Sequence, residues 1–157
     1  MSPLLANLLL ALLWMALMGS RQPVHFLLGF LLGFGALALL APLAGTASYV
    51  RKLPHAVAFA AFFLKELVKA NLRVAQDVIT PKALRRPGVV AVPLSTRDAS
   101  AIALLANVLT LTPGSVTLDV ADDRSVLYVH CMFVDDPEAV RAEIKNGFER
   151  RVMELLR

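Results

Sequence analysis

A charged stripe in a helical segment carries the residues of this chain that are best placed for ion chemistry. Lys65 and Glu66 directly follow the uncharged run Val57–Leu64, and Lys69 comes one helical turn later. Ionisable groups beside apolar helix are expensive in a membrane and usually functional there, so these three residues are candidates for an ion path or a subunit interface. The alternative, which the sequence favours, is a solvated stripe at the level of the lipid headgroups.

The other reactive side chains form no catalytic or metal-binding pattern. Cys131 is the single thiol, and its neighbour His130 would point to the opposite face of a strand, so no adjacent base activates it. Asp119, Asp122 and Asp123 lack the spacing of a calcium loop, and the histidines lack zinc spacing. Nucleotide-binding, hydrolase and metalloprotease motifs are missing from the sequence as well. We therefore expect no enzyme activity, no metal and no cofactor.

Membrane-associated elements must position the charged stripe. Of the sixteen Lys and Arg residues, only Arg21 lies within the first fifty positions. Two uncharged runs, Pro3–Gly19 and Gln22–Val50, flank the short polar turn that contains it. A membrane-crossing helix needs roughly 20 apolar residues, so residues 1–50 are predicted to form a transmembrane hairpin. A cleaved signal peptide is the alternative for the first run, but the basic start and the cleavage site are both missing.

Two glycines mark one face of the second predicted helix. Gly29 and Gly33 are four residues apart, a spacing that lets helix backbones approach closely in membranes. We expect this face to pack against the first span or against another subunit. The alternative is chance, because glycine is common in membrane helices.

Residues 51–87 are predicted to form an amphipathic helix followed by a basic linker. Polar side chains recur every four residues from Lys65 to Asp77, and the helix is expected over about residues 55–79, before Pro81. Its uncharged part is short for a span, so we expect it to lie in the membrane interface. Crossing the bilayer as a third span is the alternative.

The basic residues predict the orientation and the lipid partner. Residues 51–97 hold nine basic and two acidic side chains, whereas Arg21 stands alone in the opposite loop. The positive-inside rule places the chain from Arg51 onward in the cytoplasm. Such a basic belt suits anionic lipid headgroups. The sequence contains no basic patch with interleaved aromatic residues, so we expect no nucleic-acid binding.

Residues 88–157 are predicted to form a small cytoplasmic α+β domain. The turn Thr112-Pro113-Gly114-Ser115 suits a β-turn, because Gly114 can adopt a positive φ, and we expect this turn to orient a helix against the sheet. The predicted elements follow the order β-α-β-β-α. They are strand Val89–Val92, a helix capped by Ser95 or Thr96, strands Val116–Val120 and Val126–Met132, and a last helix capped by Asp135 or Asp136. The buried face of the last helix is expected to carry Val140, Ile144, Phe148 and Val152.

Several stretches together resemble the MnhE/MrpE family, whose members are one of the smaller components of the Mrp-type multisubunit Na+(K+)/H+ antiporter of bacteria. The stretches that carry the resemblance are Glu66–Asn71 (ELVKAN), Thr80–Lys82 (TPK), Asn107–Val116 (NVLTLTPGSV), Asp122–Arg124 (DDR) and Leu127–His130 (LYVH). One difference is the Cys-Met-Phe at residues 131–133, where the family often has a small residue, Leu and Asp.

The resemblance implies an accessory and scaffolding subunit of a monovalent cation/proton antiporter in the bacterial cytoplasmic (inner) membrane. Its partners would be the other membrane subunits, and Na+ or K+ and protons would pass through the complex rather than through this chain alone. The alternative is a membrane-anchored binding or signalling module that works outside any transporter. A self-sufficient transporter is disfavoured, because the two predicted spans contain no acidic or basic residue.

Overall fold

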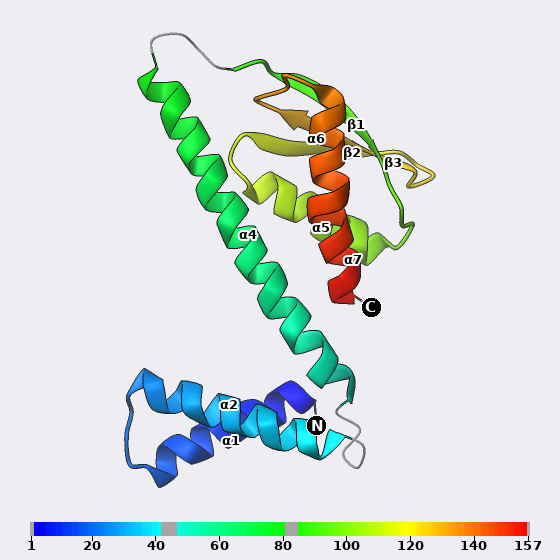
Figure 1. The fold of residues 1–157 in the computed structure, drawn as a ribbon. Helices are drawn as coiled ribbons and strands as arrows, with labels where there is room; N and C mark the ends of the chain where they lie inside the picture. Colours follow the sequence, from blue (N-terminus) through cyan, green and yellow to red (C-terminus); the bar gives the residue numbers. More distant parts are fainter. Residues whose placement is uncertain (1, 42–46, 81–84, 157) are drawn as a thin grey trace. The chain divides into compact units, whose positions relative to one another are not determined.

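The structure is a computed structural model that describes residues 2–41, 47–80 and 85–156. It separates into two compact units, residues 1–55 and residues 56–157 (Figure 1). The division of the chain predicted at residues 50 and 87 stays a prediction. Residues 42–46 of the predicted second span and residues 81–84 of the predicted linker lie outside the described residues.

The first unit is built on a hairpin of two helices, α1 (Pro3–Leu17) and α2 (Pro23–Leu39). A proline at the start of each helix suits a position where no backbone N–H is needed. Ser2 caps α1, since its side chain accepts a hydrogen bond from the backbone N–H of Leu5. Gly19, with a φ of 61°, lies in the turn between the helices, where residues with a side chain are disfavoured.

The two helices pack closely through Gly29 and Gly33. A Cβ atom at Gly29 would lie 2.8 Å from Trp14 Cβ, and one at Gly33 would overlap Asn7 Oδ1. Asn7 is fully buried, and its amide Nδ2 donates to the Tyr49 hydroxyl at 2.8 Å. The absence of side chains on these two glycines thus permits the observed contact with α1.

The sequence prediction for this unit is only partly met. Among the described residues, no helix is both long enough and apolar enough to cross a membrane. The predicted transmembrane hairpin is therefore not confirmed, although the helical hairpin itself is present. The helix that forms within the second uncharged run, Gln22–Val50, covers Pro23–Leu39.

Helix α4 (Ala47–Ile79) begins in the first unit and continues into the second. The prediction of a start near residue 55 was wrong, because Pro54 lies inside the helix. Proline removes one backbone hydrogen bond, but it does not end this helix. The predicted end before Pro81 agrees with the observed last residue, Ile79.

The second unit contains a three-stranded antiparallel sheet with the strand order β1-β3-β2. Its elements are β1 (Gly88–Pro93), α5 (Ala99–Leu111), β2 (Ser115–Val120), β3 (Val126–Cys131) and a last helical stretch formed by α6 (Pro137–Glu143), the π-helix η1 (Ile144–Glu149) and α7 (Arg150–Leu156). The predicted small α+β domain and its order β-α-β-β-α are confirmed. Helix α5 and the last helical stretch lie on the same face of the sheet (Figure 1).

The core of this domain lies between the sheet and these helices. Alternate residues of β1 and β3 point inward, and Leu127, Val129 and Val92 are fully buried. The predicted buried face of the last helix is correct: Ile144, Phe148 and Val152 are buried, and Val140 packs against them. The further buried members of this core are Val90, Leu94, Ala101, Ile102, Leu105, Val108, Leu109 and Cys131.

Two local predictions in the domain were wrong. Asp98, and not Ser95 or Thr96, caps α5, because its side chain accepts from the Ser100 N–H. In β2 the alternation of Val116, Leu118 and Val120 predicts that these apolar side chains point inward. Instead, Thr117 points inward and donates to the Ala106 carbonyl, while Leu118 is exposed. An irregularity of the strand register between Thr117 and Asp119 lies at this point.

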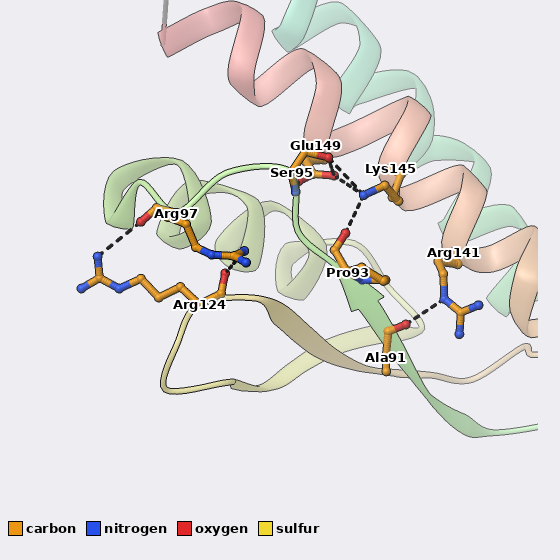
Figure 2. A network of polar contacts seen from close by, with 8 residues as sticks. All are labelled: Ala91, Pro93, Ser95, Arg97, Arg124, Arg141, Lys145 and Glu149. Atoms are coloured by element: carbon orange, nitrogen blue, oxygen red, sulfur yellow. Dashed lines mark hydrogen bonds and ion pairs between the residues drawn. The ribbon is translucent and has the colours of Figure 1, made fainter.

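A polar network that includes the buried Glu149 side chain ties the last helical stretch to the end of β1 and the residues after it (Figure 2). The Glu149 carboxylate is 2% exposed and accepts from the backbone N–H of Ser95 at 2.5 Å. Lys145 lies 3.5 Å from Glu149 and donates to the Pro93 carbonyl. One helical turn before Lys145, Arg141 donates to the Ala91 carbonyl. The bonds from Lys145 and Arg141 occupy two backbone carbonyls of β1, which is an edge strand of the sheet.

Candidate functional site

A pocket of about 150 Å³ opens in the second unit between α4, the turn after α5 and the last helical stretch. Four residues of α4 form one wall, and residues of α6 and η1 form the other. The lining residues are Glu66, Lys69, Ala70, Arg73, Leu109, Thr112, Pro113, Gly114, Ser115, Cys131, Phe133, Val140, Glu143, Ile144 and Phe148.

Aromatic contacts hold α4 beside the last helical stretch and so keep the two walls in place. The ring of Phe62 meets Phe148 edge to face, with the ring centroids 5.2 Å apart. The Arg151 guanidinium also lies over the Phe62 ring, 3.9 Å from its centroid. A Cβ atom at Gly147 would lie 3.5 Å from the Phe62 ring, which is an ordinary van der Waals contact.

The turn after α5 forms the end of the pocket. The Ser115 N–H donates to the Thr112 carbonyl, and Gly114 adopts a φ of 88°, as a turn with glycine at its third position requires. Both hydroxyls of the turn bond within the domain: Thr112 donates to the Val108 carbonyl and Ser115 to the Leu109 carbonyl. The turn therefore presents few polar groups that still need a partner.

The floor of the pocket is apolar. Leu109, Ile144 and Phe148 are buried members of the domain core, and the buried ring of Phe133 lies beside them. Cys131 also reaches the pocket from the end of β3. Burial raises the pKa of the Cys131 thiol, so the unreactive protonated form prevails at neutral pH.

Charged side chains surround the mouth of the pocket. Lys69 Nζ lies 3.4 Å from Glu66 on its own helix and 3.2 Å from Glu143 on α6. The hydrogen bond from Lys69 to Glu143 and the charge of Glu143 raise the pKa of Lys69. Arg73 stacks on the Phe133 ring at 4.4 Å and pairs with Asp135 at 3.6 Å. The mouth thus carries both signs of charge above an apolar interior.

This arrangement has the general form of a binding site. No cluster of His, Cys, Asp and Glu within the described ranges is arranged to hold a metal ion. The thiol faces apolar neighbours, and the charged groups of the mouth are paired with one another. An apolar pocket with a few polar groups at its edge is the usual form of a recognition site.

The structure brings together only some of the residues that the sequence singled out. Glu66 and Lys69 line the pocket with the turn Thr112–Gly114, whereas Lys65 is exposed and does not line it. Gly29 and Gly33 belong to the other unit.

The sequence analysis missed Glu143, Phe133 and Arg73 as members of the site. Glu143 lies 74 residues from Lys69 along the chain, and no local pattern links the two. The only signal for this wall was the spacing of the buried residues Val140, Ile144 and Phe148, which predicts a helix face but no partner for it.

Comparison with known proteins agrees with this fold over nearly the whole chain. Residues 7–155 match a family model described as Na+/H+ ion antiporter subunit. The E subunit of a Na(+)/H(+) antiporter from Bacillus subtilis is 34% identical over 154 residues, which is 98% of each chain. The corresponding E subunit from Alkalihalophilus pseudofirmus is 33% identical over 152 residues, 97% of this chain and 96% of that protein.

Two solved structures contain similar chains. A chain of the Mrp complex from Dietzia sp. DQ12-45-1b has a TM-score of 0.50 and 26% identity, covering 64% of this chain and 94% of that chain. A chain of the membrane-bound sulfane sulfur reductase, described as an archaeal respiratory membrane complex, has a TM-score of 0.54 and 27% identity, covering 97% and 98%. With a family match that includes both the helical hairpin and the α+β domain, this chain belongs to the MnhE family of Na+/H+ antiporter subunits.

Proposed function

We propose that this chain is an accessory, non-catalytic subunit of a multisubunit monovalent cation/proton antiporter in the bacterial inner membrane. The observation that carries the proposal is the match of residues 7–155 to the antiporter-subunit family, with both units of the chain included. The pocket supports a role in assembly, because its floor is apolar and the charged side chains at its mouth pair with one another. The transported cation, Na+ or K+, would be handled by the complex.

The apolar surface of the helical hairpin supports the proposal that α1 and α2 lie in the lipid bilayer. Its outward surface is almost entirely apolar, and Leu13, Leu31 and Leu39 are 55%, 63% and 85% exposed. A contiguous apolar surface of this kind marks a membrane or partner contact. We propose that α1 and α2 insert into the membrane as a unit and dock laterally on other subunits.

Helix α4 supports contact with the cytoplasmic leaflet. Its charged residues Lys69, Arg73 and Asp77 pair with residues of the second unit, so its apolar side is left outward. The large apolar residues of α4 that are more than half exposed are Val57, Leu64, Val68, Leu72, Val78 and Ile79. We propose that this side lies against lipid, with the basic residues after α2 on the cytoplasmic side of the membrane.

Purification from the native membrane tests the proposed function. The tagged chain, extracted in mild detergent, should bring the large antiporter subunits with it in stable stoichiometry, and deletion of its gene should abolish cation/proton exchange in everted vesicles. Recovery of the chain alone, together with unchanged exchange in the deletion strain, would favour the alternative of a stand-alone anchored module.

A role of Glu66 in ion transfer is a narrower proposal with its own test. Glu66 is mostly buried, with a side chain 13% exposed, and it pairs with Lys69. If this carboxylate lies on an ion route, Glu66→Gln should reduce exchange in everted vesicles while the complex still assembles. Glu154→Gln, a change at an exposed helical position, is the control. Full exchange by the assembled Glu66→Gln complex would end the proposal.

A further inference from the structure

The pocket is chemically prepared for an apolar group. Its floor is formed by side chains of the domain core, and the hydroxyls of Thr112 and Ser115 already donate to carbonyls of α5. A polar ligand would therefore lose its water without gaining the hydrogen bonds that compensate desolvation. An apolar group would pay little desolvation free energy, and it would bury core side chains that solvent can reach through the pocket.

The size of the pocket fits one side chain. Its volume of about 150 Å³ equals that of cavities which accept a single benzene ring. A branched aliphatic or an aromatic side chain fits such a space, whereas the extended chain of a lipid tail does not. The pocket also opens on the side of α4 that carries its charges, and not on the apolar side that we assign to lipid.

The mouth of the pocket opens at small cost. The pair between Lys69 and Glu143 joins the two walls, but both side chains are more than half exposed, at 64% and 54%. Exposed ion pairs contribute little to stability, so an entering group can displace this one. Once separated, the two walls differ in net charge: Lys69 and Arg73 outnumber Glu66 on α4, and Glu143 is the charged lining residue of α6.

We propose that a neighbouring subunit inserts one branched aliphatic or aromatic side chain into this pocket. The inserting segment carries an acidic residue on the side of Lys69 and Arg73 and a basic residue on the side of Glu143. This inference rests on the proposed function, because it requires that the chain be part of a complex. It adds where the α+β domain is held and what the partner surface must look like.

Filling the pocket from within tests the proposal. In the tagged full-length chain, Ala70→Phe places a ring where the partner side chain would lie, because Ala70 lines the pocket. We expect recovery of the neighbouring subunits to fall at least about tenfold, as for loss of a central contact in an interface. Ala139→Phe is the matched control, since Ala139 is exposed on α6 and does not line the pocket; it should leave recovery unchanged.

A charge reversal at the mouth gives a second variant that does not alter the core. Glu143→Lys should weaken recovery of the partner, whereas Glu154→Lys, at an exposed position of α7, should not. Unchanged recovery with both Ala70→Phe and Glu143→Lys overturns the proposed contact while the subunit function stands. A wild-type chain that recovers no other subunit overturns the proposed function and this inference with it.

The natural thiol provides a readout without any substitution. Cys131 lines the pocket, so a seated side chain should shield it from alkylation. At alkaline pH, where the thiol with its raised pKa begins to ionise, Cys131 should react slowly in the purified chain and at least about tenfold more slowly in the assembled complex. If Ala70→Phe lowers the melting temperature of the purified chain, loss of the partner could result from unfolding. The alkylation rate of the wild-type chain then decides whether a side chain occupies the pocket. Equal alkylation rates would overturn the proposal.

Discussion

At the scale of single residues, Gly33 fixes how closely the two hairpin helices approach. Its α-carbon faces the buried Asn7 side chain, and a methyl group there would overlap the amide oxygen. Gly33→Ala should destabilise the hairpin by about 1–3 kcal/mol, the usual cost of overpacking. Faster amide hydrogen exchange over α1 and α2 in the detergent-purified chain would reveal the loss.

Gly35 is a matched control on the same helix. A Cβ atom at Gly35 would meet nothing within 4 Å. Because alanine has the higher helix propensity, Gly35→Ala should leave exchange equal or slightly slower. Equal exchange in the two variants would mean that the close contact of α1 with α2 contributes nothing to stability.

Glu149 illustrates how one carboxylate can join two elements of the domain. Its oxygen atoms accept from the Ser95 N–H and lie beside Lys145, and its side chain is almost completely buried. Glu149→Gln keeps the shape but removes the charge, so the free energy of unfolding should fall by about 1–3 kcal/mol. Thermal unfolding of Glu154→Gln, whose carboxylate is exposed, should match the wild type within about 0.5 kcal/mol.

At the scale of elements, the turn between α5 and β2 depends on the backbone of Gly114. Its φ of 88° is strained for a residue with a side chain. Gly114→Ala should therefore cost the domain about 1–2 kcal/mol, measured by denaturant unfolding of the purified chain. Gly88→Ala is the control, because φ there is not positive and the added atom would make an ordinary 3.5 Å contact with Val134.

The elements that the sequence predicts well are those with local signals. The turn at Thr112–Ser115 and the capping of α6 by Asp136 depend on residues a few positions apart, and both are found where expected. The reversed β2 follows from contacts of Thr117 with α5, which no alternation rule contains. The start of α4 was missed because the predicted helix began near residue 55, whereas the observed helix begins at Ala47 and includes Pro54.

Only those residues of the candidate site that have a local sequence signal could be predicted. Glu66 and Lys69 stood out beside an apolar run, and Gly114 stood out in its turn. Their meeting with Glu143 and Phe133 requires the whole domain to fold, since the pairing partners come from distant segments. The sequence predicts the wall on α4, but the tertiary structure is needed to find the space in front of it.

At the scale of the whole molecule, the charged side and the apolar side of α4 have different contacts. The amphipathic pattern alone leaves open whether the charged side faces water. In the structure that side pairs with the chain's own domain, through Lys69 with Glu143 and Arg73 with Asp135. The apolar side is therefore free for lipid, and Asn71, an exposed polar residue of α4, donates its amide to the Leu67 carbonyl at 2.7 Å.

This orientation predicts different surroundings for two positions one turn apart. In a Cys131→Ser background, an environment-sensitive dye at Leu72→Cys should report an apolar medium when the full chain is reconstituted in vesicles with anionic lipid, because Leu72 is 65% exposed on the apolar side. The same dye at Gln76→Cys, which is exposed beside the charged side, should report water. A quencher carried on the lipid tails should then reduce only the Leu72 signal. Equal emission and equal quenching at both positions would show that α4 does not lie with its apolar side on the membrane, and the leaflet contact proposed for this chain would have to be abandoned.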